Sequence, residues 1–292
     1  MKKSLLIAGI SCICMLIPAS AALAAGGAKW SPTLGQNFAA KVFGKSGTTS
    51  KPGSVGTYFH PFHLVGNKGG PTDIGGKNTG ALRNPTFSTV LAHILMPKEV
   101  TLSGKGFVTC TFTPAEVSDP DLCPKGSELG KGSGAGFARL PKALPGTYTL
   151  EPVLTVRVFL TGPEEISLWT YNPTTKENII VGSIAKATGT YKKKFATDIT
   201  FHIPKGLIEP IPGFASQLTS FEATVDAKKN AAGKPLVALT GCPKNKTLVF
   251  GYYGLYNIGL DTKASPKISP AGGNSYSVNQ VGNLVESKVP CK

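Results

Sequence analysis

Histidine is the residue type whose spacing first suggests chemistry in this chain of 292 residues, which contains four of them. Asp198 and His202 would share one face of a strand over Phe195–Ile203, because side chains repeat every second residue along a strand. Such a pair can activate a hydroxyl nucleophile, which makes these two residues the candidate catalytic pair of a hydrolase. The alternative is a surface pair, since no GxSxG segment supplies the serine of a nucleophile elbow.

His60 and His63 are the candidate metal ligands, because imidazole is a common ligand and two of them lie three residues apart. No glutamate or third ligand is nearby, and Pro61 favours a loop over a metal-binding helix. No metal or other cofactor is therefore expected. His93 stands in an alternating apolar stretch, which predicts a hydrogen-bonded interior histidine.

Positive charge is the most unusual global property, with a formal net charge of +15. A field of this sign attracts anionic polymers such as wall phosphate polymers and acidic glycans. Lys192, Lys193 and Lys194 form a candidate binding cluster for such partners. Lysine is a hydrated, diffuse charge, and only 3 Arg accompany the 28 Lys, so specific nucleic-acid recognition is not expected. A solvated turn that protects a sheet edge is the alternative interpretation of the three lysines.

Tyrosines gather in the segment from Phe250 to Tyr256. Tyr252, Tyr253 and Tyr256 would build a sugar-stacking face if their rings pointed outward. Neighbouring residues of a strand point to opposite faces, so part of this cluster must belong to the core. Packing around an ordinary turn is the alternative.

The first 24 residues have the layout of a secretory signal peptide: two lysines, a long uncharged apolar stretch, and small residues at the end. Ala22-Leu23-Ala24 predicts cleavage after Ala24. No second apolar run is long enough to span a bilayer, so no transmembrane anchor is expected after cleavage. We therefore expect a secreted or cell-surface protein, with 29 basic and 16 acidic side chains and a net charge of +13 after cleavage.

Cysteine usage agrees with export. Cleavage leaves Cys110, Cys123, Cys242 and Cys291, and four cysteines allow three pairings. Local loop closure favours Cys110 with Cys123, which leaves Cys242 with Cys291 and ties down the C-terminus. A zinc site is disfavoured because the sequence contains no CxxC pair and the compartment is oxidising.

The elements that must position these residues are strands. With 35 Gly and 23 Pro, and with Val, Ile, Thr and Phe in short runs, the chain is predicted to be all-β, an antiparallel β-sandwich. Only Asn37–Phe43 and Pro114–Val117 look briefly helical. The expected strands are Phe87–Met96, Gly106–Thr113, Val153–Leu160, Ile166–Tyr171, Ile179–Ile184, Phe195–Ile203, Leu218–Val225, Leu236–Thr240, Thr247–Tyr253 and Val281–Val289.

The domain organisation follows from composition. Residues 25–86 are basic and rich in Gly, Ser and Thr, and the stretch from Gly44 to Thr86 lacks convincing strands, so a loop-rich arm is expected there. Residues 87–165 would form a first β lobe and residues 166–292 a second one. One continuous sandwich over both lobes is the alternative.

A resemblance is carried by Cys110 and by the segment from Cys123 to Ala135, which reads CPKGSELGKGSGA. It resembles the C…CPxGSxxGxGxA signature of a set of uncharacterised secreted proteins, mostly actinobacterial. The resemblance implies a β-sandwich and no known catalytic or binding residues. The same segment is not a phosphate-binding loop, because Gly126 to Lys131 is one residue short of the GxxxxGK spacing.

The sequence therefore favours a secreted or envelope-associated, non-enzymatic protein that binds anionic wall or matrix polymers through its basic surface. Two alternatives remain open at this stage. One is a secreted hydrolase that acts on an extracellular polymer, and the other is a structural or assembly protein of the cell surface.

Overall fold

The computed structural model is all-β over the residues that it describes, namely 29–31, 36–44, 52–63, 87–140, 153–258, 260, 267–268 and 276–291. The expected signal peptide lies outside the described residues. In the described part, no helix has the length and apolar character needed to cross a membrane.

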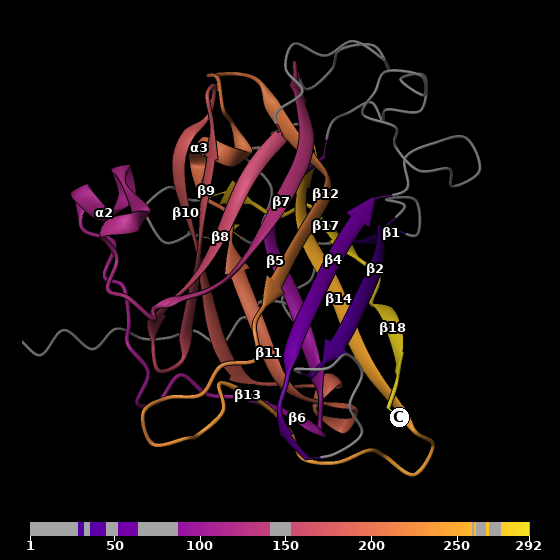
Figure 1. Cartoon of the computed structure of the whole chain (residues 1–292). Helices are drawn as coiled ribbons and strands as arrows, with labels where there is room; N and C mark the ends of the chain where they lie inside the picture. The colour runs from indigo at the N-terminus through magenta and orange to yellow at the C-terminus, as the bar shows by residue number, and fades with distance from the viewer. Residues whose placement is uncertain are drawn as a thin grey trace, which may run out of the picture.

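Thirteen strands form one large sheet, in the spatial order β1-β17-β14-β5-β11-β10-β9-β8-β7-β12-β4-β2, with β18 also paired to β14. Neighbours in it run antiparallel except β1 and β17, which are parallel (Figure 1). Its strands are β1 (Lys29–Ser31), β2 (Gln36–Phe43), β4 (Gly56–His63), β5 (Phe87–Pro97), β7 (Glu128–Arg139), β8 (Val153–Gly162), β9 (Glu165–Asn172), β10 (Lys176–Lys186), β11 (Phe195–His202), β12 (Ala215–Val225), β14 (Thr247–Ile258), β17 (Gln280–Gly282) and β18 (Val285–Pro290).

Smaller elements complete the described part. They are β3 (Gly53–Ser54), β6 (Val100–Leu102) and β13 (Val237–Leu239) in a three-stranded sheet, β15 (Lys267–Ile268) and β16 (Tyr276–Ser277) in a two-stranded sheet, the α-helices α2 (Pro114–Ser118) and α3 (Lys205–Ile208), and the 3-10 turns η3 (Pro120–Leu122) and η4 (Tyr191–Lys193).

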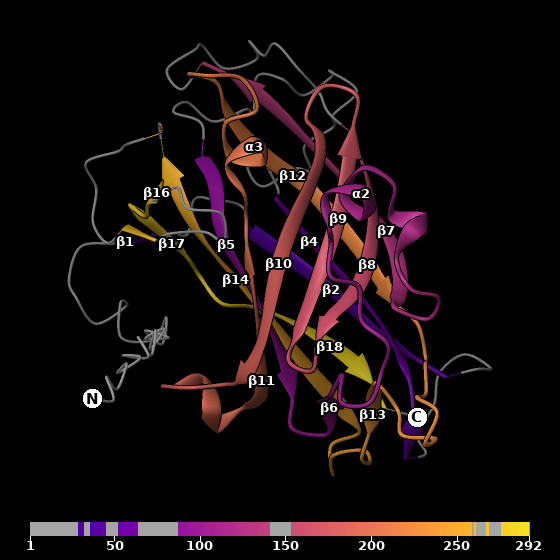
Figure 2. The same ribbon diagram turned by 90° about the vertical axis from the view of Figure 1, so that its left-hand side faces the viewer.

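The large sheet curls until its two sides almost meet, so it is nearly closed into a barrel-like structure. The meeting strands are β2 and β18, which are seen side by side in Figures 1 and 2. Side chains join them: the amide of Ala40 donates to Oγ of Ser287 at 2.9 Å, and the Gln36 side chain donates to the carbonyl of Asn283. The antiparallel all-β prediction is confirmed, and one curled sheet takes the place of two separate stacked sheets.

Glycines of β7 permit this curl. A Cβ at Gly130 would lie 1.8 Å from the carbonyl oxygen of Thr224, and one at Gly132 would lie 1.9 Å from that of Glu222. Only glycine lets two backbones approach so closely, and strand glycines commonly mark the bends of barrels. The glycine-rich segment therefore brings β7 against β12.

The inside of the curled sheet holds the main core. Aromatic rings fill the end near the C-terminus: Phe38 packs against Phe59 and Tyr252, with centroids 6.4 and 5.7 Å apart, and Phe59 packs edge-on against Phe250 at 5.9 Å. All four rings are buried. We call this region the packed half of the interior.

Both predicted disulfides are present, Cys110–Cys123 and Cys242–Cys291. The first packs with Phe159 outside the main core, and the second has Cys291 buried within it. Disulfides persist in oxidising compartments, so the pairing supports the expected oxidising environment of the chain.

Three local expectations are corrected. Asn37–Phe43 is strand β2 and not a helix, and the stretch from Gly44 to Thr86 contains strand β4, whose residues alternate between the core and the outer face. Gly106–Thr113 forms turns and loop, where Phe112 adopts a left-handed φ of 50°. The buried aromatic residues of β2 and β4 stabilise these two strands, although the composition of residues 25–86 suggested a loop-rich arm.

The expected helix at Pro114–Val117 is confirmed as α2. Its N-cap, Thr113, accepts a hydrogen bond from the amide of Glu116, whose carboxylate accepts one from the Thr113 amide in return. This reciprocal capping box stabilises the first turn. The boundary expected between residues 165 and 166 falls inside β9 (Glu165–Asn172), and β8, β9 and β10 pair in sequence across it.

Candidate functional site

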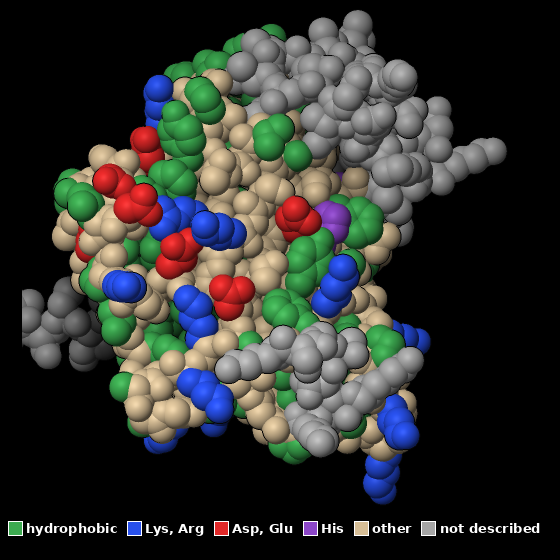
Figure 3. Space-filling model, in the orientation of Figure 1, with side chains coloured by type: hydrophobic (Ala, Val, Ile, Leu, Met, Phe, Trp, Pro, Cys, Tyr) green, Lys and Arg blue, Asp and Glu red, His purple; other side chains and the backbone are tan. Residues whose placement is uncertain are grey.

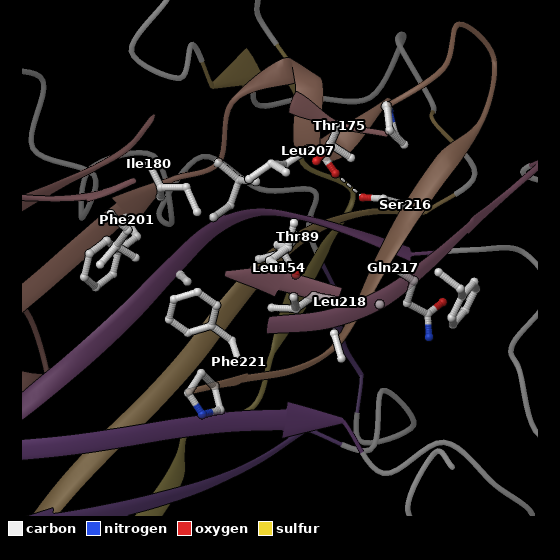
Figure 4. A pocket seen from close by; sticks show the side chains of 18 of the residues that line it. Thr89, Leu154, Thr175, Ile180, Phe201, Leu207, Ser216, Gln217, Leu218 and Phe221 are labelled. Carbon is white, nitrogen blue, oxygen red and sulfur yellow. Dashed lines mark hydrogen bonds between the residues drawn. The ribbon is translucent and has the colours of Figure 1, made fainter. Parts of the chain in front are cut away.

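A cavity of about 90 Å³ occupies the half of the interior opposite the packed aromatic rings. It lies where β4, β7 and β11 end and where β5, β8 and β12 begin, and Figure 4 shows its side chains. The lining residues are Pro61, Thr89, Ala92, Ile94, Ala135, Gly136, Phe137, Leu154, Leu168, Thr175, Ile180, Phe201, Ile203, Leu207, Pro210, Ser216, Gln217, Leu218, Phe221 and Tyr252. This lining is predominantly apolar, and among the described residues it contains no Lys, Arg, Asp, Glu or His.

Small residues keep this half of the interior open. Ala92 on β5 and Ala135 and Gly136 on β7 line the cavity, whereas the rings of the packed half come from β2, β4 and β14. On β10, Gly182 gives room to the ring of Phe201, since a Cβ there would lie 2.5 Å from a ring carbon. The ring therefore lies against the sheet wall.

A bulge in β5 turns one lining residue inward. Leu91 pairs with Leu255 and Thr89 pairs with Tyr256, so Val90 is an extra residue in the strand. Strict alternation would place Thr89 on the outer face with Leu91, but the extra residue shifts the pattern and Thr89 lines the cavity. Bulges commonly re-aim side chains at the rims of barrels and beside functional sites.

A second bulge does the same in β12. Leu218 pairs with Gly136 and Ser220 pairs with Ala135, which makes Thr219 the extra residue. Its hydroxyl donates to the carbonyl of Ala135 at 2.9 Å. Leu218 then joins the cavity lining on the same side as Phe221. Two strands thus deviate from regular alternation at the same end of the sheet.

Two threonine hydroxyls contribute polar atoms to the cavity lining. Oγ1 of Thr89 and Oγ1 of Thr175 are buried and find no hydrogen-bond partner in the part of the chain that the structure describes. Buried polar groups normally have a partner, so each of these hydroxyls requires an explanation. The hydroxyl of Ser216, by contrast, donates to the carbonyl of Leu207.

Helix α3 borders the cavity. Leu207 from the helix and Pro210 just after it contribute to the lining, and Ile208 is fully buried on the outer side of the sheet, in a cluster with Val90 and Leu91. The helix follows Pro204, its N-cap, directly after β11. The short helix thus has apolar contacts with the inside and the outside of the sheet.

The predicted Asp198–His202 pair has a different partner in the structure. Asp198 accepts a hydrogen bond from Nδ1 of His93, at 3.0 and 3.1 Å to its two carboxylate oxygens, and Thr200 contacts the same nitrogen at 3.1 Å. His93 is 2% exposed and stacks on Tyr253 at 4.2 Å, which confirms the expected hydrogen-bonded interior histidine. A hydroxyl on Nδ1 is on the wrong nitrogen for a catalytic triad, whose nucleophile contacts Nε2.

His202 shares the strand face of Asp198 but is not bonded to it. Its buried Nδ1 has no hydrogen-bond partner among the described residues. Burial lowers the pKa of His202, and the nearby His93 lowers it further. The side chain is therefore a neutral, half-buried imidazole at pH 7.

The two candidate metal ligands, His60 and His63, lie on β4, in a strand and not in the expected loop. Nε2 of His60 contacts Oγ of Ser220 at 2.9 Å on the outer face, whereas His63 is buried with its ring 5.6 Å from that of Tyr256. Residues three apart in a strand point to opposite faces. The pair therefore cannot hold one metal ion together.

The candidate lysines form and follow the short turn η4 at the surface. Lys192 and Lys193 are exposed, and Lys194 forms an ion pair with Glu286 at 2.6 Å. One third of the cluster's charge is thus compensated within the protein.

The candidate tyrosines do not form a sugar-stacking surface, because Tyr252, Tyr253 and Tyr256 are at most 3% exposed. Burial raises the pKa of Tyr252 to about 12 and that of Tyr253 still further. Tyr252 borders the cavity, while Tyr253 stacks on the outer face.

The sequence reasoning missed the cavity. Part of its lining stands in predicted strands, among them Ala92, Leu154 and Phe201, but no strand was predicted over β7. The small residues of β7 and the alternating Ala92 and Ile94 of β5 were the available signals. Comparisons of this chain with models of known protein families, with curated proteins and with solved structures found no match in any of the three.

Proposed function

We propose that this protein binds the slender apolar part of a small molecule inside its curled sheet. The observation that carries the proposal is the cavity, whose walls are built by strands from most of the sheet and by α3. Concave sites lined by apolar side chains with few polar groups are where proteins bind small molecules. A cavity inside a barrel-like sheet is a frequent form of such a site.

The volume limits what can be enclosed. An engineered cavity of about 150 Å³ in another protein takes up benzene. The cavity here, at about 90 Å³, is smaller. It suits a hydrocarbon chain or a small branched group, with the rest of a larger ligand outside the mouth. Each buried methylene contributes about 0.8 kcal/mol, so a short chain already gives measurable affinity.

Thermal unfolding with straight-chain alcohols tests this proposal. A ligand that binds only the folded state at one hundred times its Kd adds about 2.7 kcal/mol to the free energy of unfolding. We expect the unfolding midpoint to rise with 1-hexanol, and more with 1-octanol at equal concentration, until the chain exceeds the cavity. Calorimetric titration would show a negative heat-capacity change, as apolar burial requires.

A matched pair of variants localises the binding. Ala92→Leu places three additional carbon atoms in the cavity, whereas Ala185→Leu makes the same change on the exposed outer face of β10. The first variant should lose the midpoint shift and the second should keep it. Equal shifts in both variants would mean that the alcohols bind elsewhere.

The charge of the chain favours a second function, retention of the exported protein on anionic wall or matrix polymers. Among the described lysines, only Lys194 is ion-paired with a carboxylate, so the other ammonium groups keep their charge for external partners. The face in Figure 3 mixes basic and acidic side chains without one large patch. Such a distribution supports weak, salt-sensitive adsorption and not the recognition of one sequence or shape.

Adsorption is tested on isolated cell walls. The mature protein should bind at low ionic strength and be released by salt, because exposed charges are screened. Lys192→Gln combined with Lys193→Gln should lower the salt needed for release, with Lys205→Gln combined with Lys234→Gln as the control of equal charge. Retention that strong salt leaves unchanged would contradict this second function.

A further inference from the structure

We infer that the ligand of the cavity is an uncharged amphiphile, an apolar chain that carries a hydroxyl, ether, ester or carbonyl oxygen, which Thr89 and Thr175 recognise by hydrogen bonding. This inference rests on the proposed function and names the chemical class of its ligand. Two observations carry it: the unsatisfied hydroxyls and the missing charge in the lining.

The first observation is that both hydroxyl oxygens are buried without a partner in the described part of the chain. Thr89 is 5% exposed, and both threonines line the cavity. A hydroxyl can donate one hydrogen bond and accept others. Leaving it unpaired in an apolar space is unfavourable, so a ligand oxygen placed there would satisfy a group that the fold leaves open.

The bulge in β5 determines that the Thr89 hydroxyl points into the cavity. Without the extra residue Val90, Thr89 would point outward together with Leu91. The backbone remains paired at the bulge, since the Val90 carbonyl accepts a hydrogen bond from the amide of Ile203 at 3.0 Å, so the bulge is a built feature of the fold. Its effect here is to aim a polar side chain into an otherwise apolar wall beside Ala92 and Ile94.

The second observation concerns charge. The described lining contains no basic side chain to pair with a carboxylate or phosphate and no acidic one to pair with an amine. Transfer of an unpaired charge into such surroundings is strongly unfavourable. A fatty acid would therefore enter with its carboxyl group protonated or leave it outside, whereas a neutral oxygen can enter.

The test compares three ligands of one chain length, 1-octanol, n-octane and octanoate, by calorimetric titration at pH 8 with the full exported chain. In the wild type we expect 1-octanol to bind and octanoate to bind far more weakly. Thr89→Val keeps the shape of the side chain and removes the hydroxyl. It should weaken 1-octanol binding about fivefold to tenfold, since one hydrogen bond contributes about 1 kcal/mol. Binding of n-octane should stay unchanged or tighten.

Further variants guard against misfolding and separate the two threonines. Thr89→Ser keeps a hydroxyl and should retain most of the 1-octanol affinity, while Thr175→Val repeats the test at the turn between β9 and β10. Unfolding midpoints of all variants, measured without ligand, show whether the fold is intact.

The outcomes separate this inference from the function on which it rests. If the wild type binds n-octane and 1-octanol, and neither Thr→Val variant changes the ratio of their affinities, the polar recognition is wrong and the apolar cavity stands. Octanoate binding as tightly as 1-octanol at pH 8 would also overturn the inference. If none of the three ligands binds the wild type, the proposed function itself fails.

Discussion

The two halves of the interior of this curled sheet differ in how completely their side chains fill the space. In the packed half, Phe38, Phe59, Phe250 and Tyr252 pack ring against ring. In the other half, which we call the hollow half, Ala92, Ala135 and Gly136 stand among larger apolar residues and a cavity of about 90 Å³ remains.

The difference shows where this fold is stabilised and where it has been left open. Close packing of buried rings supplies dispersion and hydrophobic free energy in the packed half. The hollow half omits some of that stabilisation and also contains the bulges at Val90 and Thr219. Proteins typically depart from optimal packing at functional sites, and the incomplete packing of the hollow half is why we place the site there.

The largest expected effect comes from removing a ring in the packed half. Phe250 is fully buried, so Phe250→Ala should lower the free energy of unfolding by about 3 to 5 kcal/mol. Phe201→Ala is the matched change at the cavity wall and should cost less, because its ring already borders open space. Denaturant unfolding measures both. Equal losses would show that the two halves do not differ in packing.

The next effect concerns the bridge that ties the packed half to the C-terminus. Cys242 and Cys291 are 49 residues apart, and Cys291 is buried against the main core. Replacing both by alanine should lower the free energy of unfolding by about 2 to 4 kcal/mol, because the unfolded chain gains freedom. The same change at Cys110 and Cys123, 13 residues apart and outside the main core, should cost less. Unfolding under non-reducing conditions ranks the two; a reversed order would contradict the chain-entropy explanation.

The strands show how much of this fold could be predicted from the sequence. The expected strand Phe87–Met96 corresponds to β5, and the expected strand Val153–Leu160 lies within β8, because apolar and β-branched runs between turn residues are a local signal. Both disulfides were also predictable, since loop length constrains the pairing of four cysteines. The strands of the C-terminal half were predicted more accurately than those of residues 25–86.

The rest depended on contacts between distant residues. β4 contains Pro61 and two histidines, so its composition suggested a loop. Phe59 is nevertheless buried by Phe38 from the paired strand β2 and by Phe250, which lies far along the chain. The cavity was harder still. Strict alternation misplaces Thr89 by one face, and the bulge that corrects it appears only in the register with β14. No local pattern of residues specifies such a register.

A substitution of equal size in both halves sharpens the comparison further. Ala40 on β2 is 8% exposed within the packed core, so Ala40→Leu should overpack it and cost about 1 to 3 kcal/mol. Ala92→Leu makes the identical change beside the cavity and should be neutral or slightly stabilising, since it fills empty space. The thermal unfolding midpoint of each variant, compared with that of the wild type, measures both effects. A destabilisation by Ala92→Leu as large as that by Ala40→Leu would mean that the cavity is closed in solution.

The smallest expected effect is a pH dependence at the hollow half, where His202 ends β11 next to the cavity residue Ile203. Burial holds the pKa of His202 below its usual value, so the unfolded chain binds a proton there more readily than the folded one. Its contribution to stability is therefore complete above the pKa of an unfolded histidine, about 6.5, and is lost as the pH falls below that value.

His202→Gln removes this proton uptake, and the variant should lose less stability than the wild type between pH 7.5 and 5.5. His60 also has a lowered pKa and remains in both proteins, so only the difference between the two denaturation curves reports His202. Parallel curves would show that this imidazole is as accessible to protons in the folded protein as in the unfolded chain.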